Sequence, residues 1–288
     1  MKKIIRAEHA GMCFGVRQAI QLALNTAGRE PLTILGELVH NETVLAQLRS
    51  RNIQMEDQLQ RVATGLVMVT AHGASEAARQ KAEGRGLRVL EATCPLVKLV
   101  QRTVTDLVSQ GFHPVIIGSR NHAEVRGLTE DLAAYDVVSA EVEVATVAAR
   151  PRFGVVAQTT QPIDKVRRIV AALREHFPDS EVRFIDTVCL PTKQRQAAAI
   201  ELAQHSQVVL VIGGPNSNNT RELSATCRRH CPRVFQVQKP EDIQADWFGA
   251  VDTIGITAGT STPDELIDAV EARVRDLARC PVLAAAHN

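Results

Sequence analysis

Short runs of apolar, mostly β-branched residues alternate along the chain with longer amphipathic stretches. The runs predict strands at residues 3–7, 32–36, 66–70, 87–90, 114–118, 153–157, 182–185, 208–213, 234–237 and 253–257. The stretches between them predict helices, for example at residues 16–25, 76–83, 94–109, 163–176, 193–205 and 263–278. Several strands are apolar throughout, which is typical of parallel strands covered on both faces. The pattern therefore predicts an α/β fold with mostly parallel sheets, in which the acidic stretch 136–145 is a surface connection.

Residues able to bind ligands or metals follow the predicted strands, at the strand ends where open α/β sheets form their ligand sites. Two polar motifs and then a cysteine recur in three series: His40, His72 and Cys94; His122, Thr159 and Cys189; Ser217, Ser261 and, at the N-terminus, Cys13. The spacing from each cysteine to the next series is 27 or 28 residues. We therefore expect three α/β lobes related by pseudo-threefold symmetry, whose strand ends could point to one centre. The lobes are residues 14–96, 97–193 and 194–288, and the N-terminal strand in residues 1–13 completes the third.

If the three strand ends converge, Cys13, Cys94 and Cys189 come together. Three thiolates are soft ligands, which bind zinc, copper(I) or an iron–sulfur cluster. A 4Fe–4S cluster on three cysteines would leave one iron open, whereas a zinc ion would need a fourth ligand such as histidine. No C-x-x-C motif decides between these readings, and three separate buried thiols are a further interpretation. We interpret Cys227 and Cys231, one helical turn apart, as core residues rather than metal ligands, and leave Cys280 without a role.

A second group of strand-end residues consists of neutral hydrogen-bond donors, namely His40, His72, His122, Ser217, Asn219 and Ser261. Such donors beside helix N-termini predict a site for an anion, most simply a phosphate or diphosphate. The chain has neither a Walker lysine motif nor a G-x-G-x-x-G motif, so a nucleotide-type phosphate loop is not expected. The carboxyl of Glu124, beside His122 and Thr159, could run a proton relay. A carboxylate at a helix start can equally serve only to offset the helix dipole.

Composition narrows the range of partners. With 33 Lys and Arg against 32 Asp and Glu, the net charge is +1, which argues against electrostatic binding to nucleic acid or to an anionic membrane. Seven Phe, one Trp and one Tyr are few for a base-stacking surface. The longest strongly apolar run, 208–214, is far shorter than the roughly 20 residues of a membrane helix, and no signal-peptide core is present. We expect a cytoplasmic protein with reduced cysteines.

The strand-end motifs, taken in order, resemble those of the 4-hydroxy-3-methylbut-2-enyl diphosphate reductase family, also called the IspH or LytB family. They are Gly-Met-Cys13-Phe-Gly-Val-Arg, Leu-Val-His40-Asn41, Ala71-His72-Gly73, Ala-Thr-Cys94-Pro-Leu-Val, His122-Ala-Glu124-Val, Gln158-Thr159-Thr160, Asp-Thr-Val-Cys189 and Ala-Gly-Thr-Ser261-Thr-Pro-Asp. Each motif is short, but together they span nearly the whole chain. The resemblance implies a trefoil of three α/β lobes around a central, oxygen-sensitive 4Fe–4S cluster. It also implies a reductive dehydroxylation that gives isopentenyl and dimethylallyl diphosphates, the last step of the methylerythritol phosphate route.

The resemblance also implies roles for single residues. Cys13, Cys94 and Cys189 would hold the cluster, leaving one iron open to the substrate hydroxyl. The substrate would be bound by His40, His72, His122, Thr159, Ser217, Asn218, Asn219 and Ser261. His122, Glu124 and Thr159 would form the proton network, with Glu124 as its central acid. A ferredoxin or flavodoxin would supply the electrons.

Five positions depart from the family pattern. Asn218 stands where a serine is expected, Leu190-Pro191 follows the third cysteine, Ala123 replaces a proline, and Gln101 replaces a common histidine. The departures at Asn218 and Leu190-Pro191 motivate an alternative, a divergent paralogous iron–sulfur reductase or lyase that acts on another allylic or acetylenic phosphate. A non-catalytic protein with a cluster or zinc ion at the same cysteines is the alternative from another functional class.

Overall fold

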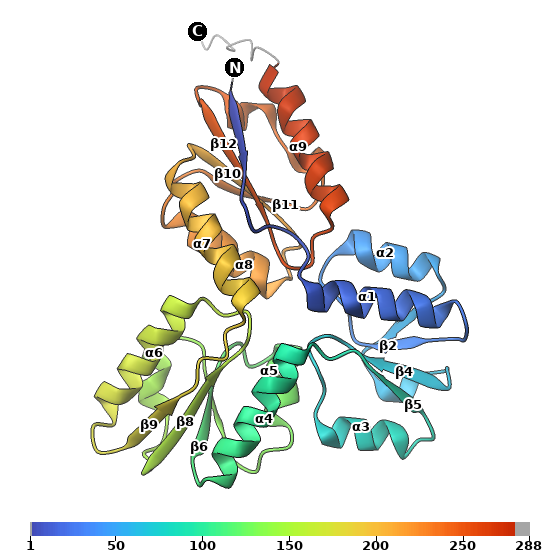
Figure 1. The fold of residues 1–288 in the computed structure, drawn as a ribbon, viewed down its shortest axis with the longest axis vertical. Helices are drawn as coiled ribbons and strands as arrows, with labels where there is room; N and C mark the ends of the chain where they lie inside the picture. The colour runs from blue at the N-terminus through green and yellow to red at the C-terminus, as the bar shows by residue number, and fades with distance from the viewer. Residues whose placement is uncertain (1, 280–288) are drawn as a thin grey trace. The chain divides into compact units, whose positions relative to one another are not determined.

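The computed structural model describes residues 2–279 of the chain. Three separate four-stranded sheets are present, each with helices packed on it, and every strand pairing in the described residues is parallel (Figure 1). The predicted α/β class with parallel sheets is confirmed. None of the helices between residues 2 and 279 has the length and apolar character needed to cross a membrane.

The chain forms two compact units, and sheet A lies in the first, which comprises residues 2–13, 39–44 and 194–279. Its strands, in the order β1, β12, β10 and β11, span Lys3–Arg6, Thr253–Ala258, Val208–Ile212 and Val234–Val237. The N-terminal strand therefore pairs with the C-terminal one. Helix α9 (Asp264–Arg279) covers one face, and α7 (Leu190–Gln204) and α8 (Asn218–Arg228) cover the other (Figure 1). Because both faces are covered, all five residues of β10 are buried and apolar.

Sheet B lies in the second unit, which comprises residues 14–38 and 45–193. Its strands, in the order β3, β2, β4 and β5, span Gln54–Glu56, Thr33–Leu35, Leu66–Val69 and Arg88–Glu91. The helices in this part of the sequence are α1 (Phe14–Ala27), α2 (Glu42–Ser50) and α3 (Glu76–Glu83). Ser75 caps α3 by accepting the amide hydrogen of Ala78 at 3.0 Å. The cap fixes the point where the chain leaves the loop after β4 and enters the helix.

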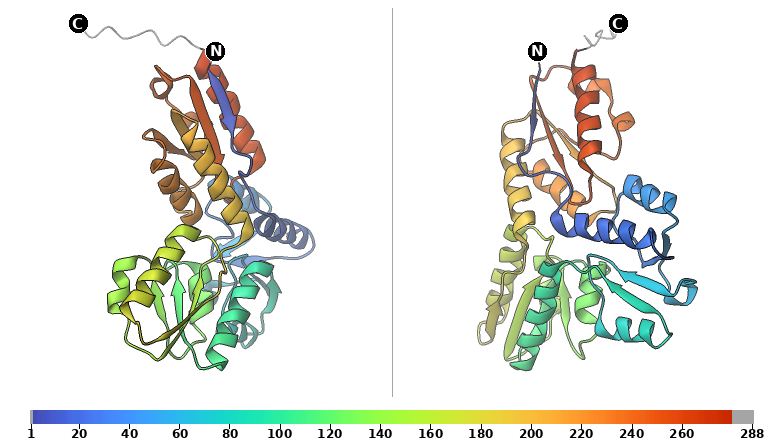
Figure 2. Two further views of the ribbon diagram at one scale, coloured as in Figure 1. Left: turned by 60° about the vertical axis from the view of Figure 1, so that its left-hand side comes forward. Right: turned by 45° about the vertical axis from the view of Figure 1, so that its right-hand side comes forward.

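Sheet C also lies in the second unit. Its strands, in the order β7, β6, β8 and β9, span Asp136–Val138, His113–Ile117, Arg152–Ala157 and Glu181–Phe184. Alternate residues of β8 point to opposite faces. Phe153 and Val155 pack towards α6 (Ile163–His176), while Val156 packs towards α4 (Pro95–Ser109) and α5 (Ala123–Thr129), as Figure 2 shows for the helices. The carboxyl ends of β6 and β8 lead directly into the segments that carry His122 and Thr159.

All ten predicted strands and all six predicted helices are present, with bounds within three residues of those expected. Two three-residue strands, β3 and β7, were not predicted. The interpretation of residues 136–145 as a surface connection is wrong, because this stretch contains β7 and a 3-10 helix at Glu141–Thr146. The prediction gave weight to the acidic residues of this stretch and overlooked Val138 and Val144, which are buried in the core of sheet C.

Candidate functional site

Glu124 is the only Asp or Glu among the buried side chains of residues 2–279, with 1% of its surface exposed. It lies in the first turn of α5, where the Nδ1 atom of His122 accepts its amide hydrogen at 3.2 Å. Both carboxyl oxygens accept hydrogen bonds from Thr159, Oε1 from the backbone amide at 2.6 Å and Oε2 from the hydroxyl at 2.9 Å. Burial raises the pKa of Glu124 to about 7, although the two hydrogen bonds from Thr159 act to lower it. This carboxyl can therefore take up and release a proton near neutral pH.

His72 and His122 come from the strand ends of two different sheets and contact each other edge to face. Their ring centroids lie 5.1 Å apart, with an interplanar angle of 85°. His72 follows β4, and its Nδ1 lies 3.4 Å from the hydroxyl of Thr70. His122 follows β6 and is the residue that caps α5. The second unit therefore brings together two of the predicted anion-binding histidines.

Two of the predicted cluster cysteines are tied to the same region through their backbones. The amide of Cys94 donates to the carbonyl of Ala71, next to His72, at 3.0 Å. The amide of Cys189 donates to the carbonyl of Thr159 at 3.1 Å. The second unit thus holds six of the predicted site residues, His72, Cys94, His122, Glu124, Thr159 and Cys189, in one connected set of contacts.

The remaining predicted residues belong to the first unit. His40 comes from the segment after β2, whereas the others follow strands of sheet A. The carbonyl of His40 packs against Gly214 so closely that a side chain at Gly214 would collide with it. A Cβ on Gly259 would lie 3.5 Å from Nδ2 of Asn219, so the loop after β12 meets the start of α8 here. This loop carries Ser261, and the carbonyl of the preceding Thr260 accepts the amide hydrogen of Cys13 at 3.1 Å.

Several polar atoms in the first turn of α8 and in the loop after β12 are buried without a partner. Within residues 2–279, no hydrogen bond reaches Nδ2 of Asn218, Nδ2 of Asn219, Oγ1 of Thr220 or Oγ of Ser261. An unsatisfied buried polar group costs about 1–3 kcal/mol, and a ligand with hydrogen-bonding oxygens could pair with these four atoms. Ser217 differs, because its oxygen caps α8 by accepting the amide hydrogen of Thr220 at 3.3 Å. Its hydroxyl hydrogen can still be donated.

The cysteines fall into two classes by burial. Cys227 and Cys231 are fully buried in the core of sheet A, whereas Cys13, Cys94 and Cys189 are half-buried. Burial, and next the neighbouring Cys231, raise the pKa of Cys227 to about 12, so this thiol stays protonated. The predicted core role of Cys227 and Cys231 is confirmed. Cys280 lies outside the described residues.

The half-buried cysteines have the surroundings of metal-binding thiolates. Each directly precedes a helix, α1, α4 or α7, whose N-terminus carries a partial positive charge. A Cβ on Gly15 would lie 2.7 Å from Sγ of Cys94, so only glycine leaves this sulfur its room. Three soft donors of this kind fit an iron–sulfur cluster. Cys13 belongs to the first unit and the other two to the second; within the described residues, no three His, Cys, Asp or Glu side chains are grouped to hold a metal ion.

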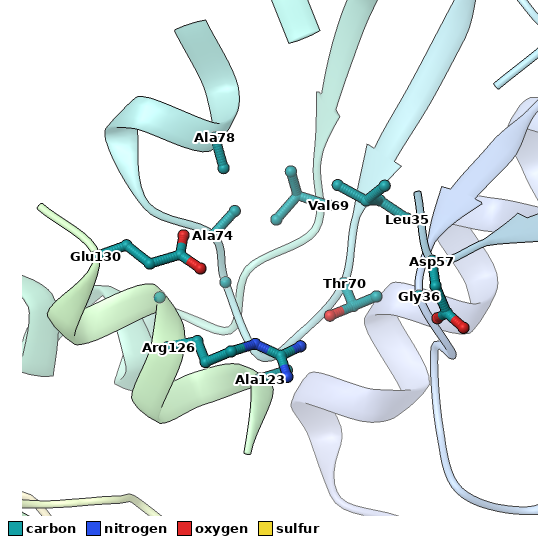
Figure 3. A pocket seen from close by; sticks show the side chains of 12 residues that line it. Leu35, Gly36, Asp57, Val69, Thr70, Ala74, Ala78, Ala123, Arg126 and Glu130 are labelled. Atoms are coloured by element: carbon teal, nitrogen blue, oxygen red, sulfur yellow. The ribbon is translucent and has the colours of Figure 1, made fainter. Parts of the chain in front are cut away.

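A cavity of about 640 Å³ opens at the carboxyl ends of β2 and β4, in the second unit. Figure 3 shows Arg126 of α5 among the side chains that line it. Its wall also includes Gly73 and Ala123, which follow His72 and His122 in the chain. The cavity therefore adjoins the pair of histidines.

Sequence reasoning did not identify two residues that shape the site, Gly15 and Thr220. The only signal for Gly15 was its position two residues after Cys13 in the first motif. Asp186 orients the segment that leads to Cys189. Its Oδ1 accepts the amide hydrogen of Val188 at 3.2 Å, and its Oδ2 pairs with Lys193 at 2.8 Å. These contacts fix the turn that carries Cys189.

Comparison with known proteins identifies the family of this chain. The sequence model of the family described as LytB protein matches residues 4–275. The 4-hydroxy-3-methylbut-2-enyl diphosphate reductase of Trichlorobacter lovleyi is 37% identical over 275 residues, which cover 94% of this chain and 97% of the relative. The protein of the same name from Aquifex aeolicus is 33% identical, and the match covers 96% of this chain and 97% of the relative.

Solved structures share the fold. The structure of (E)-4-hydroxy-3-methyl-but-2-enyl diphosphate reductase, the terminal enzyme of the non-mevalonate pathway, has a TM-score of 0.69 at 33% identity and covers 96% of this chain and 100% of that chain. The E-1-hydroxy-2-methyl-but-2-enyl-4-diphosphate reductase from Plasmodium falciparum has a TM-score of 0.89 and covers 100% of this chain and 93% of that chain; at 24% identity, this likeness concerns the fold alone. The match to the family model over nearly the whole chain, together with full-length relatives above 30% identity, shows that this chain belongs to the LytB family.

Proposed function

We propose that this chain is a reductase that converts 4-hydroxy-3-methylbut-2-enyl diphosphate into isopentenyl and dimethylallyl diphosphates. Relatives that carry the name of this reductase are 33–37% identical to it over nearly its full length. The observation that carries the proposal is the buried Glu124, whose pKa is raised to about 7 and whose carboxyl is oriented by Thr159. An enzyme that removes a hydroxyl group as water needs such an acid, because hydroxide is a poor leaving group.

The reaction consumes two electrons and two protons. The carbon–oxygen bond of the substrate breaks, a carbon–hydrogen bond forms, and the oxygen leaves as water. We assign the proton for the leaving oxygen to Glu124, because its protonated form is stabilised by burial and it can release the proton at neutral pH. Thr159 holds the carboxyl through two hydrogen bonds, and His122 accepts the amide hydrogen of Glu124. These contacts keep the carboxyl in one orientation before the substrate arrives.

We assign the diphosphate to the neutral donors at the strand ends. The buried, unpartnered donors of Asn218, Asn219 and Ser261 support this role, because each could pair with a phosphate oxygen. The other members of this group are His40, His72, His122, Thr159 and Ser217. Binding energy from the diphosphate, remote from the bond that breaks, would position the hydroxyl end of the substrate.

We propose Cys13, Cys94 and Cys189 as the ligands of one 4Fe–4S cluster per chain, with one iron open. When bound, such a cluster supplies electrons one at a time and a Lewis-acidic iron for the leaving oxygen. The half-buried thiols at helix starts, and the space that Gly15 leaves beside Cys94, support this assignment. In contrast, the core thiol of Cys227 has a raised pKa and is unsuited to metal binding.

Three further assignments complete the proposal. The electrons come from a ferredoxin or flavodoxin, because a two-electron reduction needs an external carrier. The reaction takes place in the cytoplasm, where thiols stay reduced. The chain has three lobes, residues 14–96, 97–193 and 194–288 with 1–13; in support, the described part of each contains the strands of one sheet.

The test is anaerobic turnover of 4-hydroxy-3-methylbut-2-enyl diphosphate by cluster-reconstituted protein with reduced viologen as the electron source. Iron content of about four atoms per chain is confirmed beforehand. Formation of isopentenyl and dimethylallyl diphosphates at an enzyme-like rate supports the proposal. A loaded protein that gives neither product contradicts it, and other phosphorylated allylic or acetylenic alcohols are then the substrates to try. A different substrate of this kind is the second candidate function. It is favoured by the buried amide of Asn218, which stands where the family pattern has a serine.

A further inference from the structure

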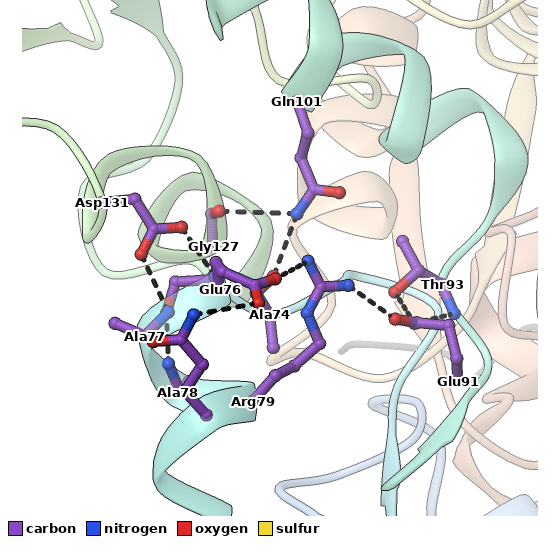
Figure 4. A network of polar contacts seen from close by, with 12 residues as sticks. Ala74, Glu76, Ala77, Ala78, Arg79, Glu91, Thr93, Gln101, Gly127 and Asp131 are labelled. Carbon is purple, nitrogen blue, oxygen red and sulfur yellow. Dashed lines mark hydrogen bonds and ion pairs between the residues drawn. The ribbon is translucent and has the colours of Figure 1, made fainter. Parts of the chain in front are cut away.

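Gln101 joins two segments that carry predicted substrate ligands. Its side chain leaves α4, and its Nε2 atom donates to the carbonyl of Ala74 at 3.0 Å and to that of Gly127 at 3.5 Å (Figure 4). Ala74 lies two residues after His72, and Gly127 lies in α5, which His122 caps. One amide group therefore connects the loop after β4 with the helix of the proton network.

The two segments touch through their backbones at the place where Gln101 binds. A Cβ on Gly127 would lie 3.4 Å from the carbonyl oxygen of Gly73 and from Cα of Ala74, so α5 packs directly on this loop. Gly73 itself has a φ of +79°, a conformation that other residues rarely adopt. A Cβ on Gly73 would lie 3.2 Å from Nε2 of Gln101. The loop 72–74 thus packs closely against α5, and Gln101 links the two by one hydrogen bond to each.

Other contacts hold the far side of the same loop. The hydroxyl of Ser75 donates to Glu130 at 2.6 Å. The carboxylate of Asp131 accepts the amide hydrogens of Glu76 and Ala77 at 2.6 and 3.0 Å (Figure 4). These contacts anchor the start of α3. Gln101 binds Ala74, which is nearer to His72 in the sequence than the residues that these contacts hold. Loss of the Gln101 side chain would therefore free the part of the loop next to the two histidines.

We propose that Gln101 is a positioning residue, which fixes His72 against His122 at the 5.1 Å observed and so sets the affinity for the diphosphate substrate. This inference rests on the proposed function, because it treats both histidines as substrate ligands. Gln101 acts through the loop 72–74 and α5, and does not itself touch the reacting atoms. Losing one hydrogen bond of 0.5–1.5 kcal/mol corresponds to a change of roughly 2- to 10-fold in affinity.

The first variant is Gln101→Glu, which keeps the size of the side chain but turns a carboxylate towards two carbonyl oxygens. Gln101→Leu removes the donor without adding a charge and serves if the first variant does not fold. We expect both to raise KM about 3- to 10-fold and to leave kcat within about twofold, because the effect is on substrate binding. Gln101→Lys, which keeps a donor, should recover much of the affinity. Thr103→Ala is the matched control, since it removes only a hydrogen bond within α4, to the carbonyl of Leu99.

Hydrogen–deuterium exchange of the cluster-loaded protein gives a readout that does not depend on turnover. In Gln101→Leu, exchange should rise in a peptide covering residues 71–78 and stay unchanged in β10. Unchanged exchange in this peptide overturns the inference, as does faster exchange with an unaltered KM. If wild-type protein shows no turnover, the proposed function has failed, whereas the exchange data still decide whether Gln101 holds the loop.

Discussion

At the scale of single residues, burial turns an ordinary carboxyl into an acid that works near neutral pH. Within the described residues, the pKa of Glu124 is set by its burial and by the two hydrogen bonds from Thr159. Desolvation therefore outweighs the two hydrogen bonds that favour the charged form. The neighbouring hydroxyl and amide of Thr159 add orientation without neutralising the charge.

We expect Glu124→Gln to lower kcat by about 100-fold or more, because the amide keeps the shape of the side chain but has no acidic proton. KM should change little, and the bound iron should be unaffected. Steady-state kinetics with reduced viologen measure both constants. Glu83→Gln, an exposed residue at the end of α3, is the control and should behave as wild type. Near-normal kcat in Glu124→Gln removes this residue from its role.

The same carboxyl makes stability depend on pH. Because the folded pKa of about 7 lies above the usual 4.5, its contribution to stability is fully present below about pH 4.5 and is lost as pH rises through 7. A shift of this size corresponds to about 3 kcal/mol. Wild type should therefore lose more stability than Glu124→Gln between pH 5.5 and 8.5. Urea midpoints of the two proteins at both pH values measure this, and equal losses contradict the prediction.

Removal of two adjacent hydroxyls in the loop after β12 should have different effects, one on substrate affinity and the other on stability. Ser261 has no hydrogen-bond partner within the described chain, so Ser261→Ala should leave the denaturation midpoint unchanged and raise KM about 10-fold or more. Thr262 donates to the carbonyl of Ile212 at 3.0 Å. Thr262→Val should therefore lower the free energy of unfolding by about 1–3 kcal/mol. A loss of stability in Ser261→Ala, with unchanged KM, would give this serine a structural role.

At the scale of elements, the start of α1 is shaped to the start of α4. Gly15, in the first turn of α1, leaves a space that Sγ of Cys94 fills. The helix itself gains nothing from a glycine, which is unfavourable in helices. The residue is therefore explained by the sulfur beside it.

We expect Gly15→Ala to lose most of the iron, because the added methyl group would displace the sulfur of Cys94 or move the helix. Gly28→Ala, just beyond the other end of α1, is the matched control, since its nearest neighbours would be 3.7 Å from the new Cβ. Iron per chain and the visible absorption of the reconstituted proteins are the measurements. Full iron content in Gly15→Ala contradicts the assignment of Cys94 as a ligand.

Elements with a strong hydrophobic period were predicted well, and the exceptions have physical reasons. Strand β10 is five consecutive apolar residues, and α6 has its predicted bounds because one face is apolar. Strands β3 and β7 were missed because each is three residues long and contains charged or polar side chains. Their pairing with β2 and β6 decides their conformation, and pairing partners distant in sequence do not appear in a local pattern.

The sequence allowed prediction of which residues belong to the candidate site, because residue type and position after a strand indicate them. Glu124 and Thr159 were named together, but their two hydrogen bonds and the resulting pKa depend on packing between α5 and the end of β8. The close fit around Gly127 was not predictable, because only the folded chain shows which backbone segments touch there.

At the scale of the whole molecule, the proposed cluster draws its ligands from segments far apart in sequence. Cys13, Cys94 and Cys189 each precede a helix, and the chain between them contributes strands to two different sheets. Replacement of one proposed cluster cysteine should therefore lower the amount of iron bound per chain. Replacement of a core cysteine should affect only the packing of the core.

We expect Cys189→Ser to lose most of its iron and all turnover while staying folded. Cys227→Ala should keep its iron and lose only about 1–2 kcal/mol of stability, because it leaves a small cavity in the core of sheet A. Iron per chain and denaturation midpoints distinguish the two effects. Iron loss in Cys227→Ala with an unchanged midpoint would reverse the assignment of these cysteines.

The pairing of β1 with β12 has a consequence for how the protein is made. Lys3 lies opposite Thr253, so β1 finds its partner strand only after about 250 further residues have been synthesised. At about 5–20 residues per second, this wait lasts roughly 10 to 50 seconds. During that time two isoleucines, Ile4 and Ile5, have no sheet to join. Translation rate and chaperones that cover the nascent β1 should therefore influence the yield of this protein, even though the strand is only four residues long.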